Sequence, residues 1–260
     1  MKEEKTSYSV PAVEKTIAIL NLLTDHEIGI NEIYKQLNLP KSSTFVILST
    51  LENNGIIERT DQGKYRLSSA VFHWGMGYYK NVDIVGIARP HLRRLIQDTP
   101  FSAHLAVLID GKSIFIDKIE DHSFVRFATY VGQAIPFYLS SAGKALGIGM
   151  TDEEIILSLQ KHVPVKLTDK SHVTTEQILE DIRTARKLGY STEDEQFEKG
   201  IRCIGAPVYN FTGQIKWGIS IIALSRDLPE DSFERIGGQV KETAATISSE
   251  LGYRHKANFL

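Results

Sequence analysis

The chain has 260 residues, of which 42% are hydrophobic and 24% charged, and its formal net charge at pH 7 is −2. This composition is typical of a globular protein and excludes disorder over most of the chain. No apolar run reaches the roughly 18 residues that a membrane helix needs, and the N-terminus lacks the apolar segment of a signal peptide. We therefore expect a cytoplasmic protein without a membrane partner.

Three short helices are predicted before residue 54. Pro11 suits the first turn of a helix, and apolar side chains then recur at three- and four-residue spacing. The buried faces of the three helices are marked in order by Val13, Ile17, Leu20 and Leu23, by Ile30, Ile33 and Leu37, and by Phe45, Leu48 and Leu51. Pro40 ends the second helix because it restricts Leu39 to extended geometry. The third helix runs from about Lys41 to Asn53.

Two strand-like runs, 56–59 and 64–67, follow the third helix and are joined by turn residues 60–63. A helix, a second helix, a tight turn, a third helix and a two-stranded ribbon make up a winged helix-turn-helix, which is a fold of DNA-reading modules. We assign this domain to residues 1–67.

A helix from about Ser69 to Asn81 carries large apolar side chains on several faces, which is typical of a helix that packs between partners. We interpret residues 68–82 as a linker helix, followed by another helix to about Gln97. Beyond it, strands are predicted at 103–109, 113–119, 124–129, 201–209 and 216–224, and helices at 139–148, from 151, at 174–188 and at 230–251. The predicted fold class is therefore α+β, with a larger domain over residues 83–260.

The third predicted helix and the ribbon hold the candidate DNA-binding residues. Hydroxyl groups near the start of a helix can meet phosphates and base edges, and basic groups bind phosphates. The candidates are Lys41, Ser42, Ser43, Thr44, Val46, Arg59, Lys64 and Arg66. The alternative is that the serines only cap the helix and that the basic groups only form a solvated surface.

The charge balance of this region speaks against DNA binding, and only the placement of its cations favours it. Lys41, Arg59, Lys64 and Arg66 all fall at the recognition helix or the ribbon. The first 80 residues hold nine basic and nine acidic side chains, whereas a DNA-binding domain is normally basic. With few phosphate contacts in each module, useful affinity needs two modules on one operator. We expect Lys41→Ala and Arg66→Ala to weaken binding to every DNA sequence and to reduce its salt dependence.

Three stretches, in this order and at this spacing, resemble the IclR family of transcriptional regulators. They comprise residues 10–15, 30–33, 39–43 and 63–67, then 132–136 and 141–145, then 198–208 with Gly213. The resemblance implies a winged helix joined to a GAF-like antiparallel-sheet domain that binds an effector. It also implies a homodimer or homotetramer on a pseudo-palindromic operator in double-stranded DNA. Such regulators, more often repressors, control catabolic operons in response to small organic or aromatic acids.

The sequence departs from the family early in the recognition helix. The family often has a basic pair there, and this chain has Phe45 and Val46. Because an arginine is missing, the usual contact with guanine is not expected. This difference indicates another operator or weaker binding.

The resemblance also assigns an effector pocket. Its residues would be Gly132, Gln133, Ala134, Glu193, Ile201, Cys203 and Ser220. Backbone N–H groups of glycines can hold a carboxylate, and a hydroxyl and a thiol add polar points to an apolar cavity. Ile222, where some relatives have a serine, predicts a less polar pocket. The alternative is that Cys203 is a small buried hydrophobe and that Ser220 satisfies a backbone group.

Two other classes of protein are alternatives to a regulator. An enzyme could pair Cys203 as nucleophile with His104, His162 or His172 as base, but nothing in the sequence places these residues together. The eight histidines show no metal-ligand spacing, and one cysteine makes neither an internal disulfide nor a four-cysteine zinc site. We therefore expect no enzyme, no metal and no cofactor. The second alternative is an interaction protein that binds a small molecule and has a degenerate DNA-binding domain.

Overall fold

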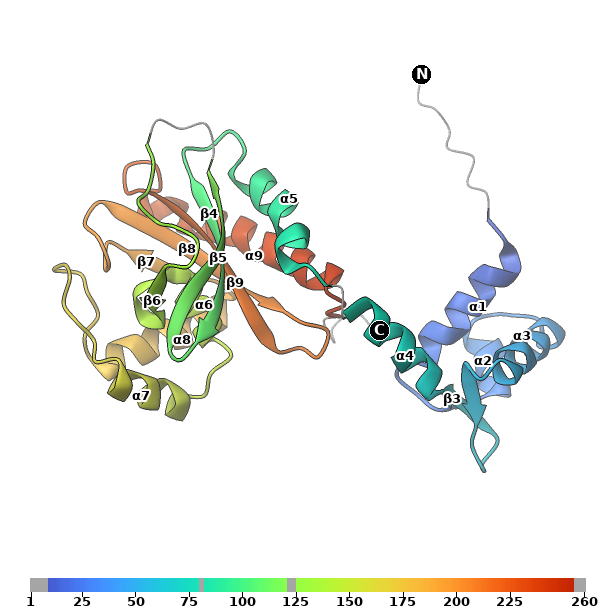
Figure 1. The fold of residues 1–260 in the computed structure, drawn as a ribbon. Helices are drawn as coiled ribbons and strands as arrows, with labels where there is room; N and C mark the ends of the chain where they lie inside the picture. The colour runs from blue at the N-terminus through green and yellow to red at the C-terminus, as the bar shows by residue number, and fades with distance from the viewer. Residues whose placement is uncertain (1–8, 80–81, 121–124, 255–260) are drawn as a thin grey trace, which may run out of the picture. The chain divides into compact units, whose positions relative to one another are not determined.

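The computed structural model describes residues 9–79, 82–120 and 125–254 (Figure 1). The chain forms two compact units, Met1–Val82 and Asp83–Leu260, and each has its own hydrophobic core. Both units combine helices with antiparallel strands. Within the described ranges, no helix is both long enough and apolar enough to cross a membrane.

The first unit combines helices with a small sheet. Its elements are α1 (Pro11–Leu22), β1 (Ile28–Gly29), α2 (Ile30–Gln36), α3 (Lys41–Asn53), β2 (Ile57–Arg59), β3 (Lys64–Leu67) and α4 (Ser69–Tyr79). The strands pair antiparallel in the order β1-β3-β2. Strand β1 was not predicted, because two residues are too few to carry an alternating pattern. The predicted end of the linker helix, residues 80–81, lies outside the described residues.

A tight turn sets the angle between α2 and α3. Asn38 has a φ of 49°, in the left-handed region that asparagine tolerates better than most residues. The backbone N–H of Leu39 then donates to the Tyr34 carbonyl at 2.9 Å. Ile33 of α2 and Leu48 of α3 are fully buried in the core of this unit. The turn and the core together fix which face of α3 points outward.

The buried face of α1 differs from the predicted one. Val13 and Ile17 are 52% and 53% exposed, whereas Ile19 and Leu23 are buried. Val13 and Ile17 are four residues apart and share one side of the helix, and Ile19 and Leu23 share another. The core therefore contacts the Ile19 side, and the sequence pattern had combined the two sides into one.

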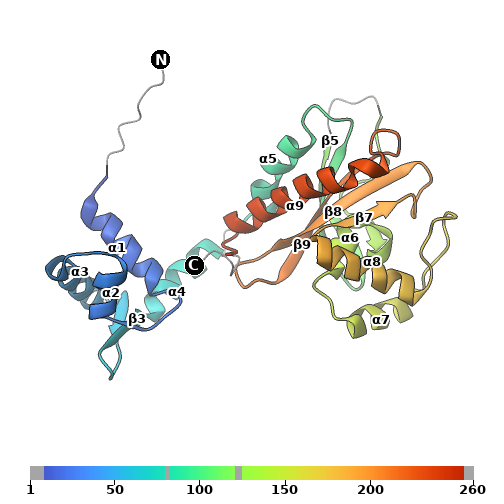
Figure 2. The ribbon, with the colours of Figure 1, turned by 180° about the vertical axis from the view of Figure 1, so that it is seen from behind.

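The second unit is a six-stranded antiparallel sheet with helices on both faces (Figures 1 and 2). In spatial order the strands are β6 (Ala134–Pro136), β5 (Lys112–Glu120), β4 (Ser102–Ile109), β9 (Ile215–Leu224), β8 (Ile201–Tyr209) and β7 (Ser191–Asp194). One face is covered by α5 (Ile84–Ile96) and α9 (Phe233–Glu250), the other by α6 (Ser141–Gly147), α7 (Asp152–Lys161) and α8 (Thr175–Leu188).

Several predicted bounds in the second unit are wrong. Residues 125–129 form no strand, and Phe124 lies outside the described residues. The edge strands β6 and β7 were not predicted. A 3-10 turn, η1 (Phe137–Leu139), precedes α6, and another, η2 (Glu230–Ser232), precedes α9, so both helices begin later than expected.

Two glycines bring α6 unusually close to the sheet. A Cβ atom on Gly205 would lie 2.6 Å from the Ser141 backbone, and one on Gly218 would lie 2.7 Å from the Ala142 carbonyl. Neither position has room for a larger side chain. The close approach places Ser140 and Ser141, at the start of α6, beside the same sheet face as the pocket described below.

Candidate nucleic-acid interface and ligand pocket

The exposed face of α3 is made by residues one turn apart. Lys41 and Ser42 are exposed, and so are Phe45 and Val46 one turn later. Thr44 is fully buried on the opposite side. This arrangement corrects two predictions, because Phe45 was expected in the core and Thr44 on the outer face. Thr44 faces the core, and its hydroxyl donates to the Pro40 carbonyl one turn earlier.

Hydroxyl groups of α3 mostly bond to their own backbone. Ser43 and Thr44 each donate to the Pro40 carbonyl at 3.0 Å, and Thr50 donates to the Val46 carbonyl at 2.8 Å. Their protons are therefore used within the helix. The prediction that Thr44 contacts DNA is therefore wrong, because its side chain is buried and its hydroxyl is hydrogen-bonded to Pro40. Ser42 is exposed.

Three cations on this side of the first unit have no carboxylate partner among the described residues. They are Lys41, Arg59 and Lys64, all exposed. The Lys41 ammonium lies 4.9 Å from the centre of the Tyr34 ring, and the Arg59 guanidinium lies 5.7 Å from that of Tyr65. Aromatic rings orient these cations without neutralising them, so both charges stay available to phosphates.

Arg66 differs from these three cations. Its Nη1 lies 3.1 Å from Glu27 Oε1, and its Nε lies 2.6 Å from Glu58 Oε1. These two carboxylates raise the pKa of the guanidinium and compensate its charge. The pairing ties β3 to β2 and to the residue before β1. The structure therefore reduces the phosphate contact that the sequence assigned to Arg66.

The floor of the ligand pocket is one face of the large sheet. Register places Glu193 of β7 opposite Cys203 of β8, and Cys203 opposite Ile222 of β9. On the neighbouring rung, His104 of β4 lies opposite Ser220 of β9. Because side chains alternate along a strand, all five point to the same face. Above them lies a cavity of about 390 Å³.

Most of the predicted effector residues meet in this cavity. Those that line it are Gln133, Glu193, Ile201, Cys203 and Ser220. Gly132 and Ala134 do not line it and are exposed on either side of Gln133. The Gly132 N–H donates to the Phe115 carbonyl at 2.7 Å, so this glycine N–H is already occupied within the fold.

Aromatic and aliphatic side chains form the walls of the pocket. They are Phe115, Phe127, Ile135, Leu139, Phe197, Ile201 and Leu224. Polar groups are few and placed at defined points, which is the usual composition of a small-molecule site. Phe115 lies on β5, and Phe127 lies in the loop that leads to β6. Their strand and loop bring them over the floor.

His104 is a pocket residue that the sequence did not assign. It is 1% exposed, stacks on Phe115 with ring centres 4.3 Å apart, and has Nε2 2.8 Å from the Thr129 hydroxyl. Burial, with a smaller contribution from nearby Lys118, lowers the pKa of His104 to about 3. The imidazole is therefore neutral at pH 7. His104 reaches the pocket because β4 pairs with β9, and the sequence does not show this pairing.

Glu193 and Cys203 form a buried polar pair. Glu193 is 1% exposed, and its Oε1 accepts the backbone N–H groups of Gln196 and Phe197. Burial raises the pKa of Glu193 despite these hydrogen bonds. Burial and the adjacent carboxyl group also raise the pKa of Cys203 well above its usual range. The sulfur is therefore a protonated donor, which is the wrong state for a nucleophile.

The three histidines proposed as catalytic partners bond to groups other than Cys203. His162 Nε2 is 2.7 Å from the Asp110 carbonyl, and His172 Nδ1 is 2.9 Å from Asp181 Oδ2. His104 bonds to Thr129, as described above. In the described parts of the chain, no hydrogen bond joins any of them to Cys203, and no cluster of His, Cys, Asp and Glu could hold a metal ion.

A buried lysine supports the segment that carries Glu193. Lys144 of α6 is 1% exposed, and its Nζ donates to Asp181 Oδ2 at 2.6 Å, to the Thr192 carbonyl at 3.2 Å and to Gln196 Oε1. These bonds tie α6 and α8 to the end of β7. Lys144 does not line the pocket but holds β7, the strand that brings Glu193 to the floor.

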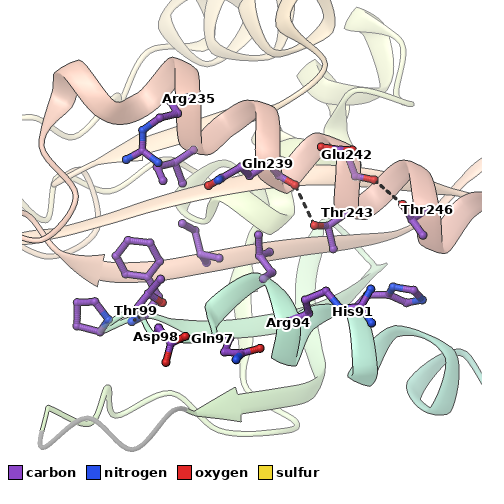
Figure 3. Close-up of a pocket in the computed structure, with 15 residues that line it drawn as sticks. His91, Arg94, Gln97, Asp98, Thr99, Arg235, Gln239, Glu242, Thr243 and Thr246 are labelled. Atoms are coloured by element: carbon purple, nitrogen blue, oxygen red, sulfur yellow. Dashed lines mark hydrogen bonds between the residues drawn. The ribbon is translucent and has the colours of Figure 1, made fainter. Parts of the chain in front are cut away.

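A larger cavity, of about 580 Å³, lies between α5 and α9 (Figure 3). It is on the opposite sheet face, because Ile221 lines it whereas Ser220 and Ile222 line the pocket. Thr243 and Thr246 on its wall donate to carbonyl groups of their own helix. None of the predicted effector residues reaches it, so the smaller pocket is the better candidate site.

A winged helix-turn-helix in one chain with a sheet domain that encloses a ligand-sized pocket defines a class, the ligand-responsive transcriptional regulators. Residues 12–61 match the family model "IclR helix-turn-helix domain", and residues 76–249 match "Bacterial transcriptional regulator IclR C-terminal". The chain belongs to the IclR family. The family predicted from the sequence is thereby confirmed.

Known relatives agree with this assignment. The HTH-type transcriptional repressor AllR of Escherichia coli K12 is 32% identical over 251 residues, covering 94% of this chain and 91% of that protein. The crystal structure of the Agobacterium tumefaciens repressor BlcR superposes with a TM-score of 0.84 at 26% identity, covering 95% and 99% of the two chains. Pseudomonas aeruginosa HmgR, at 17% identity and a TM-score of 0.81, shares the fold. The chain is a DNA-binding transcriptional regulator and not an enzyme.

Proposed function

We propose that this regulator is a repressor that leaves its operator when a small organic molecule enters the 390 Å³ pocket. The observation that carries the proposal is the pocket floor, where Glu193, Cys203 and Ser220 converge beneath apolar walls in a chain that also has a recognition helix. The repressors AllR and BlcR among its relatives support repression.

The lining of the pocket favours a small acid with an apolar or aromatic body. Arg126 at the mouth is the cation in the described lining, and it pairs with Glu120 at 3.0 Å. A ligand carboxylate would lie at this mouth, near the Gln133 amide. The other end of the ligand would donate a hydrogen bond to Glu193. Phe115 and Phe127 would cover the body between the two ends.

Apolar side chains on the first unit support a homodimer, alone or within a tetramer. Val13 and Ile17 of α1 are exposed, together with Val10 just before the helix, and Phe72 and Trp74 are exposed on α4. Covering them against a second copy would remove apolar area from water. Two copies would present two recognition helices to a pseudo-palindromic operator.

The test combines a ligand screen with a DNA-binding assay on the full chain. Aliphatic and aromatic carboxylates are screened by thermal shift, because a ligand of the folded state raises the melting temperature. Each compound that raises it is added to a mobility-shift titration with DNA from upstream of the gene. We expect salt-dependent binding and its loss on ligand addition.

Two results would contradict the proposal. The absence of any salt-dependent shift would favour an interaction protein with a degenerate DNA-binding domain. A ligand that raises the melting temperature but leaves the DNA complex unchanged would show that ligand binding does not control DNA binding. The variant Gln133→Ala removes a half-buried polar contact at the mouth while leaving the core intact, so it should need more ligand for the same release of DNA.

A further inference from the structure

An apolar pair lies at the centre of the exposed face of α3. Phe45 is 59% exposed and Val46 is 61% exposed. Lys41 and Ser42, one turn earlier, are exposed on the same face, whereas Thr44 is buried behind it. Large apolar side chains gathered on the outer face of a helix mark a surface that contacts another molecule.

Polar groups next to this pair are occupied within the helix. The hydroxyls of Ser43 and Thr44 donate to the Pro40 carbonyl, and that of Thr50 donates to the Val46 carbonyl. Within α3 there is no arginine or glutamine, and its asparagine, Asn53, stands two turns beyond Val46. The residue types that read guanine or adenine by paired hydrogen bonds are therefore missing from the middle of this face.

The edges of the bases decide which sequence such a face selects. Guanine presents two acceptors in the major groove, adenine an acceptor and a donor, and thymine an apolar C5-methyl group. Phenylalanine and valine side chains placed over guanine would bury its acceptors without a partner, which is unfavourable. Placed over thymine, the same side chains bury a methyl group.

We propose that Phe45 and Val46 read the C5-methyl groups of neighbouring thymines in each half-site, an inference that rests on the proposed DNA-binding function. Lys41, Arg59 and Lys64 hold phosphates beside this contact and carry no sequence information. Affinity and sequence preference therefore come from different residues. Salt weakens the phosphate contacts, whereas the thymine preference persists at every salt concentration at which binding is measured.

The test removes single methyl groups from DNA. The full chain selects duplexes from a randomised pool, and each thymine of the preferred duplex is replaced in turn by deoxyuridine, which lacks only the C5-methyl. We expect the affinity of the wild type to fall about fourfold at one or two positions of each half-site, the factor for one buried methyl group. Fluorescence anisotropy titrations measure the change.

Variants assign each methyl group to a side chain. Phe45→Ala and Val46→Ala should each lose the uracil effect at one position and keep the salt dependence of the wild type. Both side chains are exposed, so both variants should keep the melting temperature. The matched control is Val163→Ala, which removes an exposed apolar side chain just after α7 in the second unit and should keep every uracil effect.

Each contrary outcome has a distinct meaning. If uracil has no effect at any position, or if both α3 variants keep the full effect, the inference is overturned and DNA binding stands. If Phe45→Ala changes the oligomeric state but not the uracil effect, the pair is a contact between copies and the inference is overturned. If no duplex is enriched at any salt concentration, the proposed function itself fails.

Discussion

The recognition surface and the pocket floor use polar side chains in opposite ways. On the first, Lys41, Arg59 and Lys64 are exposed and lack a carboxylate partner among the described residues. In the second unit, Lys144 and Glu193 are each 1% exposed and are held by several hydrogen bonds. A change on the surface should therefore alter binding with little effect on folding. A change beneath the pocket should alter folding first.

The largest effect is expected from Lys144→Ala. The substitution removes a cation that is 1% exposed and takes a hydrogen-bond donor from Asp181, from the Thr192 carbonyl and from Gln196. Breaking a buried pair from one side costs about 3–5 kcal/mol in the free energy of unfolding. Urea denaturation measures this loss. The control Lys170→Ala removes an ammonium that pairs with two carboxylates but is half-exposed, and it should cost far less. Equal losses of stability in the two variants would contradict the claim that the buried Lys144 supports the fold more than the half-exposed Lys170.

The next effect is a pH dependence set by His104. Its pKa in the folded state is about 3, below the value of about 6.5 in the unfolded chain. The unfolded state therefore takes up a proton first, and stability falls as pH drops below about 6.5. The slope from this residue is about 1.4 kcal/mol per pH unit until the folded state is protonated as well.

Denaturation at pH 7, 6 and 5 measures this slope. The variant His104→Gln keeps a polar side chain that can bond to Thr129 and should lose the His104 share of the slope. The exposed His73 of α4 provides the matched control, and His73→Gln should keep the slope. A wild type and a His104 variant with parallel pH profiles would rule out a buried neutral imidazole.

The smallest effects on folding are expected on the recognition surface. Lys41→Ala and Lys64→Ala should each reduce the slope of log affinity against log salt by about one, because each removes one phosphate contact. Arg66→Ala should reduce it less, since Glu27 and Glu58 already compensate that charge. Anisotropy titrations from low to moderate salt make the comparison. If Arg66→Ala changed the slope as much as Lys41→Ala does, Arg66 would contact a phosphate as the sequence predicts, and its pairing with Glu27 and Glu58 would not matter.

The winged helix was predictable because local signals define it. Pro40 stops α2, and Gly55 and Gly63 both adopt the left-handed conformation that their turns need. The outer face of α3 was not predictable, because Phe45, Val46, Ile47 and Leu48 form one apolar run. Such a run has no helical period, so only packing against the core decides that Leu48 is buried and Phe45 is exposed.

The pocket was predictable only where the resemblance reached it. Glu193 and Cys203 face each other across one hairpin, and both were expected to line the site. His104 joins them through the pairing of β4 with β9, which links segments more than a hundred residues apart. No local pattern encodes such a pairing. The short edge strand β7 has the sequence Ser-Thr-Glu-Asp, which carries no apolar alternation.

A ligand bound in the pocket is proposed to control the affinity of this regulator for DNA. The direct measurement is the release of the selected duplex when a ligand from the thermal-shift screen is added, with fluorescence anisotropy as the readout. It compares the wild type with Ile222→Phe, whose larger side chain fills the pocket. We predict that both proteins bind DNA equally and that ligand releases only the wild type. Equal release from both proteins, at the same ligand concentration, would show that control lies outside the pocket.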